Sequence, residues 1–258
     1  MLKRRALNTL TIGVLTTLAI TSFFVPVSWW WFVLTVFSWL VITLFGSFLI
    51  RWNYHLKSYH SNKTIDENWV SITFDDGPNT EFTPKVLKLL KQYNAKATFF
   101  CIGKQVEKHP TILLDIIDHG HSIGNHTYSH SKSFGFFGLN RVIEELRKTN
   151  MLVKDLTGLE MKLYRPCFGV TNPQIEKAVK ARELYSIGWN VRSLDTTPRT
   201  ASNILKRITS RISKGDVVLL HDTSEKTIAV LEQLLLFLQE NHLQSVPVDK
   251  LLQLKAYA

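Results

Sequence analysis

The chain has 258 residues, 45% of them apolar, which is enough to bury one sizeable core. Its formal net charge of +10 favours a partner with an anionic surface, such as a phospholipid or an acidic glycan, or else is ordinary solubilising charge. Lysine and arginine form no block with interleaved aromatic residues, so we predict no nucleic-acid partner. The only cysteines are Cys101 and Cys167, and two cysteines alone do not indicate the redox compartment.

Apolar side chains crowd residues 1–50, which are predicted to anchor the chain in a membrane. The runs 6–25 and 29–50 contain no charged residue, and each matches the roughly 20 residues that cross a bilayer. One or two transmembrane helices are therefore expected, with membrane lipid as their partner. A cleavable signal peptide is the alternative for the first run, because Lys3, Arg4 and Arg5 precede it, although the residues before Pro26 lack a small-residue cleavage site.

The orientation of this anchor stays open at the sequence level. The positive-inside rule places the amino terminus in the cytoplasm, and a hairpin that turns at residues 26–28 would return the chain to that side, consistent with Arg51 and Lys57. A single span, or a hairpin with its amino terminus outside, would instead export the rest of the chain.

Beyond a polar linker, residues 51–68, short apolar runs alternate with longer helical patterns, which predicts an α/β fold with parallel strands. Seven short strands favour a small or incomplete (β/α) barrel. An open doubly wound sheet is the alternative, but the glycine-rich first turn of such sheets is missing. The predicted strands are 70–74, 97–101, 122–124, 162–164, 184–189, 217–220 and 244–247, and the predicted helices are 83–93, 105–118, 140–156, 173–181, 201–213 and 226–241.

Two adjacent carboxylates, Asp75 and Asp76, directly follow the first predicted strand and precede the turn at Gly77-Pro78. In α/β folds the carboxyl ends of the strands form the rim where catalytic groups gather. Neighbouring carboxylates repel when both are ionised, so we expect a cation, an arginine or a metal beside them.

A pair of histidines follows another predicted strand. His126 and His130 lie four residues apart, so a helical turn would place both on one face, close enough to bind one ion. Such a pair alone is more often two surface histidines. Together with Asp76, however, the pair would form a set of two histidines and one carboxylate, which leaves positions open for water and substrate as catalytic zinc sites do.

Further polar residues end or follow predicted strands. Arg165 precedes a rigid turn and stays charged, so it can bind a carboxylate through two hydrogen bonds. His221 ends an apolar strand, where a histidine is well placed as a general acid or base if a carboxylate partner fixes its tautomer. Taken alone, such a histidine is more often a core-edge residue bonded to a backbone carbonyl. Asp195 follows the strand that contains Trp189.

Five segments in this order resemble the motifs of the polysaccharide deacetylase family, also described as the NodB homology domain or carbohydrate esterase family four. The resemblance covers about residues 69–252 and implies a catalytic domain, residues 69–253, with a distorted (β/α) barrel fold, followed by a tail, 254–258. It also implies removal of N-acetyl groups from amino sugars of a chitin-like oligomer, peptidoglycan or a surface polysaccharide. The segments are TFDDGP (73–78), HTYSH (126–130), RPCFG (165–169), WNVRSLD (189–195) and LLH (219–221).

The resemblance also assigns roles to individual residues. Asp75 would be the general base, with Arg165 orienting it. Asp76, His126 and His130 would hold a divalent metal, expected to be Zn²⁺, with Co²⁺ or another divalent ion as the alternative. The metal would polarise the acetyl carbonyl, which is a poor electrophile in an amide.

The remaining roles concern the leaving group and the acetyl group. His221 would be the general acid, steadied by Asp195, because an amine cannot leave as an anion. The backbone N–H of Phe168 would help to hold the oxyanion. Leu219 would form a wall of the pocket for the acetyl methyl group.

Two segments depart from the family pattern. In the third motif, Cys167 and Phe168 stand where a second proline and often a tyrosine are usual. In the fourth, Arg192, Asp195 and Thr196 stand where the family usually has DxxDW. The tryptophan missing at Thr196 would remove an aromatic wall beside the site, so substrate preference is in question while the metal set is not.

The leading hypothesis is thus a membrane-anchored, metal-dependent N-deacetylase of glycans. Because a glycan substrate normally lies outside the cytoplasm, we expect an extracytoplasmic domain, against the simple charge count. The alternatives are a deacylase of another amide or ester on the same site, and an inactive glycan-binding membrane protein. The inactive alternative is disfavoured because all polar groups of the predicted site occur together.

Overall fold

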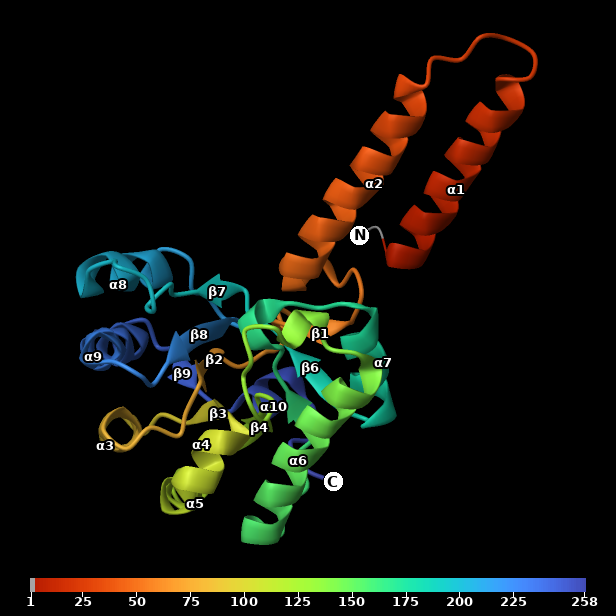
Figure 1. Ribbon diagram of the computed structural model, residues 1–258. Helices are drawn as coiled ribbons and strands as arrows, with labels where there is room; N and C mark the ends of the chain where they lie inside the picture. Colours follow the sequence, from red (N-terminus) through yellow and green to blue (C-terminus); the bar gives the residue numbers. More distant parts are fainter. Residues whose placement is uncertain (1–2) are drawn as a thin grey trace.

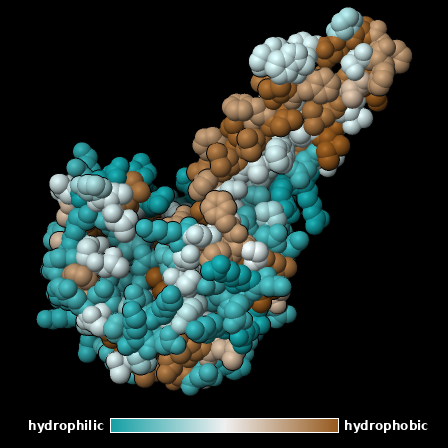
Figure 2. All heavy atoms as spheres, viewed as in Figure 1, coloured by the Kyte–Doolittle hydropathy of each residue, from teal (hydrophilic) through white to brown (hydrophobic). Residues whose placement is uncertain are grey.

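The computed structural model describes residues 3–258, and it shows a helical hairpin that projects from an α/β body (Figure 1). The hairpin consists of α1 (Arg4–Thr21) and α2 (Trp30–Phe48). Among the described residues, α2 alone is both long and apolar enough to cross a membrane, by length and composition. Large apolar side chains stay exposed along both helices, and Figure 2 shows the hairpin as a largely apolar projection on a mostly polar body.

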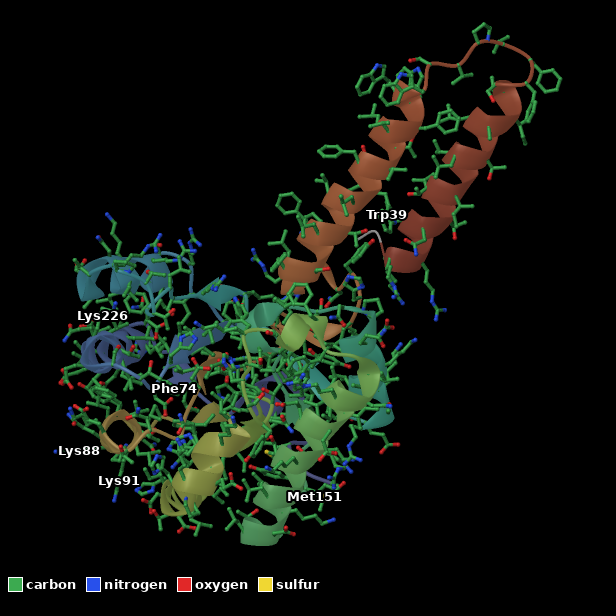
Figure 3. All side chains as sticks on the ribbon, in the orientation of Figure 1. Trp39, Phe74, Lys88, Lys91, Met151 and Lys226 are labelled. Carbon is green, nitrogen blue, oxygen red and sulfur yellow. The ribbon has the colours of Figure 1, made fainter. Side chains whose placement is uncertain are left out.

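The hairpin is bonded to itself and to the body by a few polar contacts. Trp39 on α2, labelled in Figure 3, donates its indole N–H to Asn8 on α1 at 2.9 Å. At the base of α1, Arg4 forms an ion pair of 3.1 Å with Glu176 of the body. The hydroxyl groups of Thr43 and Tyr54 lie 2.9 Å apart at the base of α2.

The body is built on one sheet in which all named strand pairs are parallel. The strand order is β1-β6-β5-β4-β3-β2-β8-β7, and β9 pairs with β2. With β1 and β7 left as edges, the sheet is a curled half-barrel, which confirms the predicted distorted (β/α) barrel. The strands are β1 (Ser58–Tyr59), β2 (Trp69–Asp75), β3 (Ala97–Cys101), β4 (Ser122–Asn125), β5 (Leu163–Tyr164), β6 (Tyr185–Ile187), β7 (Val191–Arg192), β8 (Val217–His221) and β9 (Gln244–Ser245).

Helices connect the strands and cover the outside of the sheet (Figure 1). Parallel neighbours need such crossovers, because a hairpin turn cannot join strands that run the same way. The helices are α3 (Phe82–Gln92), α4 (Gly103–Lys108), α5 (Pro110–Asp118), α6 (Leu139–Thr157), α7 (Pro173–Ala181), α8 (Ala201–Thr209), α9 (Glu225–Glu240) and α10 (Val248–Leu252), and the short 3-10 turns are η1 (Ile50–Trp52), η2 (Phe134–Phe136) and η3 (Cys167–Gly169).

The main core lies between the central strands and their covering helices. Phe74 of β2 and Phe99 of β3 stack in it at 5.0 Å between ring centroids, while Leu90 of α3 and Leu234 of α9 are fully buried beside them. Figure 3 shows Lys88 and Lys91 on the outer face of α3. The apolar side of α3 therefore faces the sheet, as its helical spacing predicts.

Several elements differ from the predicted ranges. The predicted linker contributes β1 to the sheet, and the predicted strand 184–189 is shortened to β6. β7 was not predicted, because two residues in a polar segment carry no readable alternation. The predicted helix 105–118 divides at His109, since Pro110 opens a second helix at its first position. The predicted tail packs on the body, where the Tyr257 hydroxyl accepts the Ile123 N–H at 3.0 Å.

Candidate active site and metal centre

Parallel strand register brings the predicted site residues to one edge of the sheet. Asp75 and His221 end the neighbouring strands β2 and β8 and are paired in register. His126 and Arg165 directly follow β4 and β5, which lie next to each other in the same sheet. All four residues therefore meet at the carboxyl edge of the strands, where loops converge.

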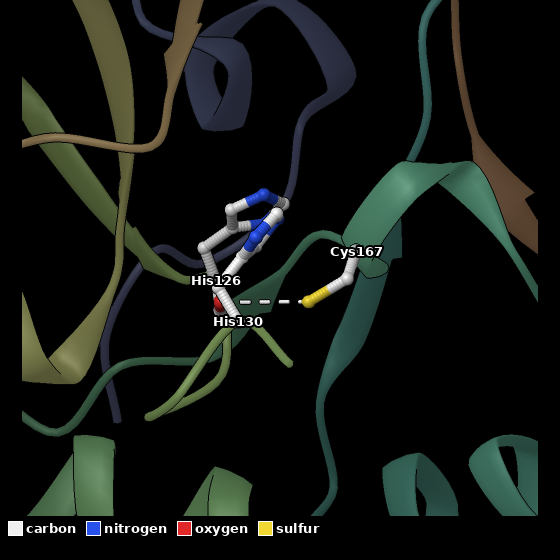
Figure 4. A group of neighbouring side chains, drawn as sticks. All are labelled: His126, His130 and Cys167. Atoms are coloured by element: carbon white, nitrogen blue, oxygen red, sulfur yellow. Dashed lines mark hydrogen bonds between the residues drawn. The ribbon is translucent and has the colours of Figure 1, made fainter. Parts of the chain in front are cut away.

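Asp76, His126 and His130 lie close enough to share one metal ion. Oδ1 of Asp76 is 3.5 Å from Nε2 of His126 and 3.4 Å from Nε2 of His130. The two imidazole rings lie 4.8 Å apart between centroids, and Figure 4 shows them side by side. Among the described residues, Asp76 Oδ1 is buried and has no hydrogen-bond partner. An orphaned carboxylate oxygen facing two imidazole nitrogens fits a divalent metal, which such ligand sets bind.

The backbone of these loops is held in an unusual conformation. Asp76, Thr127, His130, Phe168 and Leu194 all have positive φ angles although none is glycine. Side chains other than glycine adopt this region at an energetic cost, which the surrounding structure must offset. Asp76 and His130, both in this conformation, bring their side chains to within 3.4 Å of each other.

Asp75 is anchored by a buried arginine. Nη1 of Arg165 donates to Asp75 Oδ1 at 2.8 Å and to Thr73 Oγ1 at 2.7 Å. The other guanidinium nitrogens donate to the carbonyls of Ile187 and Gly188, and Arg165 is fully buried. The second oxygen, Asp75 Oδ2, lies 3.9 Å from His126 Nε2. Asp75 thus offers one free oxygen to the site, while a fixed cation binds the other oxygen.

His221 is oriented by Asp195 on the opposite side of the site. Asp195 Oδ1 lies 2.9 Å from His221 Nδ1, while Oδ2 accepts the backbone N–H of His221 at 2.8 Å. Thr227 and Ser193 donate their hydroxyl groups to the same carboxylate. With Nδ1–H directed at Asp195, Nε2 of His221 is the ring nitrogen left for a substrate.

Burial and nearby charges shift the ionisation of these groups. Burial opposes the charged form of His221, but the hydrogen bond and charge of Asp195 raise its pKa to about 9. Burial would likewise raise the pKa of Asp76, but the adjacent imidazoles of His126 and His130 hold it well below its usual range. For His130, burial and the neighbouring His126 lower the pKa. For His126, burial lowers the pKa, but the charges of Asp75 and Asp76 outweigh burial and raise it. Of the two imidazoles, His130 is thus the one favoured in the neutral form that binds a metal.

The sequence matches polysaccharide deacetylases over residues 62–187. A peptidoglycan-N-acetylglucosamine deacetylase of Bacillus cereus is 34% identical over 201 residues, which cover 74% of this chain and 91% of that protein. This chain belongs to the polysaccharide deacetylase family.

Other family members match with different coverage. A second Bacillus cereus deacetylase of the same name is 37% identical over 154 residues, covering 60% of this chain and 56% of that protein. PgdA of Listeria monocytogenes is 32% identical over 182 residues, covering 70% of this chain and 38% of that protein. The chain thus spans about half or less of these two relatives. The crystal structure of the Bc1960 peptidoglycan N-acetylglucosamine deacetylase matches with a TM-score of 0.74 and 30% identity, over 78% of this chain and 95% of that one.

The two residues that depart from the third deacetylase motif lie beside the candidate metal ligands. Cys167 is buried, and its sulfur approaches the ring nitrogens of His126 and His130 to within 4.8 Å. Its thiol donates to the His126 carbonyl at 3.8 Å, as Figure 4 shows, and lies 3.1 Å from Thr127 Oγ1. Burial raises the pKa of Cys167, so the group is a neutral thiol that braces the histidine loop. Phe168, half exposed, packs its ring 4.7 Å from that of His130.

Leu219 and the fourth motif line the far side of the site. Leu219 is 3% exposed and lies two residues before His221 on β8, so both side chains face the same side of the strand. Arg192 on β7 is paired in register with Leu219. Thr196 is exposed in the loop that follows β7.

Two carboxylates at the site carry no motif signal and were missed by sequence reasoning. Glu145 of α6 accepts the backbone N–H groups of Tyr128 and Ser129 at 3.0 and 2.7 Å and so holds the histidine loop. Asp222 is fully buried, accepts the hydroxyl of Thr83, and burial raises its pKa to about 7. The sequence could have indicated Asp222 only through its position next to His221. It gave no indication of Glu145, which lies within an ordinary amphipathic helix.

Proposed function

We propose that the protein is a metal-dependent hydrolase that removes N-acetyl groups from the amino sugars of a glycan. The observation that carries this proposal is the orphaned Oδ1 of Asp76, placed between His126 and His130 and beside the Asp75–Arg165 pair. The relatives are named as deacetylases of peptidoglycan N-acetylglucosamine, of peptidoglycan N-acetylmuramic acid and of chitooligosaccharides. An N-acetylated amino sugar is the chemistry that these names share.

Asp76, His126 and His130 would hold the metal, and Zn²⁺ suits two imidazoles and one carboxylate, with Co²⁺ as the alternative. When bound, the metal supplies Lewis acidity to the acetyl carbonyl oxygen. Asp75 lies beside this ligand set, because its Oδ2 is 3.9 Å from His126 Nε2.

Asp75 and His221 would divide the proton transfers. Asp75 takes a proton from the attacking water through its free oxygen, while Arg165 holds the other oxygen at 2.8 Å. His221 gives a proton from Nε2 to the nitrogen that leaves, because an amine anion is too poor a leaving group. Asp195 positions His221 for this step and keeps it protonated. The two groups sit in register on adjacent strands, so both can reach one amide.

Phe168 and Leu219 would bind the acetyl group itself. The backbone N–H of Phe168 lies in the tight turn η3 and would donate to the developing oxyanion, a contribution of about 2.7–4 kcal/mol for one such donor. Leu219 would bound the methyl pocket, since it is apolar and faces the same side of β8 as His221. A small apolar pocket of this kind favours acetyl over longer acyl groups.

The alternatives are a deacylase of another amide or ester, and a protein that binds glycans without turnover. A Bacillus anthracis pseudoenzyme shares the fold with a TM-score of 0.70 and 23% identity, so the fold alone does not distinguish an active protein from an inactive one. The intact pairs Asp75–Arg165 and His221–Asp195 favour an active enzyme.

The test is acetate release from chitooligomers and from peptidoglycan by the purified full chain. We expect release from at least one of them, its loss after chelation, and its return when Zn²⁺ is added. Turnover of simple acyl esters or amides without release from any glycan would favour the other deacylase. If the metal-loaded protein turned over no substrate, the remaining hypothesis would be a protein that binds glycans without turnover.

We further propose that residues 1–50 anchor the protein in a membrane, with the catalytic domain, residues 69–253, on its extracytoplasmic side. The apolar helix α2 supports the anchor, and its last turn is bonded to the domain. The glycan substrate supports the sidedness, because cell-wall glycans lie outside the cytoplasm.

A further inference from the structure

An arginine-lined cavity lies between the end of α2 and the rim of the active site. Its volume is about 280 Å³, and we call it the arginine cavity. Four of its lining residues are arginines, and none is acidic. The lining consists of Phe48, Leu49, Ile50, Arg51, Trp52, Trp189, Asn190, Arg192, Arg207 and Arg211.

The positive charge of the arginine cavity is not compensated within the described part of the chain. Over residues 3–258, no ion pair is formed by Arg51, Arg192, Arg207 or Arg211. Arg207 donates its Nε–H to the Arg192 carbonyl at 2.8 Å, which fixes its guanidinium at the wall. Guanidinium groups bind phosphate and carboxylate oxygens through paired hydrogen bonds, which a halide cannot accept. Four arginines around one cavity suit a multiply charged diphosphate better than a singly charged carboxylate.

The arginine cavity shares a wall with the active site. Arg192 is paired in register with Leu219, two residues before His221. Trp189 packs against Gly169, where an added Cβ would lie 2.7 Å from the indole ring. The residue before that glycine is Phe168, whose ring touches His130. A ligand that reaches from the cavity into the site therefore only has to cross the edge formed by Trp189.

The arginine cavity also lies at the membrane end of the molecule. Phe48, Leu49 and Trp52 on its lining are 58%, 39% and 40% exposed, as expected for side chains that face lipid. The N–H of Thr171, shortly after the third motif, donates to the Ser47 carbonyl in the last turn of α2 at 2.9 Å. With α2 in a bilayer, the cavity would lie at the depth of the lipid head groups.

We propose that the arginine cavity binds the diphosphate of a membrane lipid that carries the N-acetylated glycan. The substrate class is then a lipid-linked glycan presented at the membrane surface, rather than a soluble polymer. This inference rests on the proposed deacetylase function and on the membrane anchor. It also gives a role to Arg192, a cation where the family's fourth motif usually has an aspartate.

Binding tests the cavity independently of turnover. The full chain in phosphatidylcholine nanodiscs is titrated with dodecyl diphosphate and with inorganic pyrophosphate, and empty discs are subtracted. We expect at least tenfold tighter binding of dodecyl diphosphate. Arg211→Gln should weaken it about tenfold, because Arg211 lines the cavity, whereas Lys206→Gln, on α8 but outside the lining, should not.

Three results would overturn the proposal. Equal affinity for inorganic pyrophosphate would mean a site for free anions. Displacement of dodecyl diphosphate by phosphatidylglycerol placed in the disc would mean a site for bulk anionic lipid. Equal loss of binding in Arg211→Gln and Lys206→Gln would mean that general surface charge, and not the cavity, attracts the ligand.

Kinetics then connects the cavity to the substrate. With N-acetylglucosamine carried on a lipid diphosphate, Arg211→Gln should raise KM about tenfold while kcat changes less than twofold. An equal rise in KM for a soluble chitooligomer would contradict a role in binding the lipid diphosphate. If the wild-type protein binds dodecyl diphosphate but releases no acetate from any substrate, the deacetylase function fails while the cavity assignment stands.

Discussion

Asp75 and Asp76 are neighbours in sequence, yet their environments are opposite. Asp75 forms an ion pair with Arg165, with 2.8 Å between Oδ1 and Nη1. Asp76 has a φ of 75°, and its side chain faces two imidazoles with an oxygen that has no hydrogen-bond partner. One carboxylate is therefore equipped to accept a proton and the other to bind a cation. These partners, and not the residue type, decide which of the two aspartates accepts a proton and which binds a cation.

The Asp75→Asn substitution tests this division of roles. The amide keeps an oxygen that can accept from Arg165, so the fold should persist, but it cannot take up a proton. We expect the deacetylation rate to fall by about 10²–10⁴-fold while bound zinc, measured by elemental analysis, stays at the wild-type level.

Asp76→Ala is the matched control for that substitution. It removes the orphaned oxygen between His126 and His130, so we expect loss of zinc together with loss of activity. Full turnover by Asp75→Asn, or normal zinc content in Asp76→Ala, would refute the assignment of the two carboxylates.

Asp195 sets the pH range over which His221 can act as an acid. The hydrogen bond and charge of Asp195 outweigh burial and raise the pKa of His221 to about 9, so His221 is protonated below about pH 9 and loses its proton above it. Asp195→Asn removes the charge, which lowers that pKa. The alkaline limb of kcat/KM should therefore move to lower pH. A pH profile whose alkaline limb does not move would exclude His221 as the group that titrates there.

At the scale of elements, the central strands β2, β3 and β8 could be predicted because they are almost fully buried and consist mainly of apolar, aromatic and β-branched residues. The same reasoning failed for β1 and β7. Each has only two residues and is a strand only through its pairing with a neighbouring strand. The polar ends of β2, β4, β5 and β8 could be predicted as site residues since parallel strands share one edge. Glu145 could not, because its link to the histidine loop spans 16 residues and depends on how α6 packs.

The junction between the hairpin and the body depends on close packing at Gly46 of α2. A Cβ at this position would overlap the ring of Tyr54, which is 3% exposed and bonded to Thr43. Alanine normally stabilises a helix by about 1 kcal/mol relative to glycine. In Gly46→Ala the overlap should outweigh this gain and destabilise the protein by about 1–3 kcal/mol.

Thermal unfolding in detergent measures the effect, with Gly13→Ala as the control. Gly13 lies in α1, and a Cβ there would have nothing within 4 Å, so its replacement should be neutral or stabilising. If both variants unfold at the same temperature, Gly46 does not hold the hairpin against the body.

At the scale of the whole molecule, both helices of the hairpin reach the body at one end, where Figure 1 shows the start of α1 and the end of α2. The end of α2 lines the arginine cavity, and its Ser47 carbonyl accepts the N–H of Thr171, close to the third motif. The active site therefore lies near the base of the hairpin and is not separated from it by a long flexible linker. Sequence could predict both parts but not their junction, which rests on single contacts such as Arg4 with Glu176.

The side of the membrane that carries the body is decided by two opposing effects. Arg4, Arg5 and Arg51 lie at the body end of the hairpin, and the positive-inside rule would keep that end in the cytoplasm. A cell-wall glycan substrate requires the body to lie on the extracytoplasmic side. We expect function to prevail, so a phosphatase reporter that folds only outside the cytoplasm should be active when fused after Ala258, and a cytoplasmic reporter fused there should be inactive. The reverse result would place the body inside, where the accessible glycans are those still being assembled on their lipid carriers, and would restrict the substrate to that class.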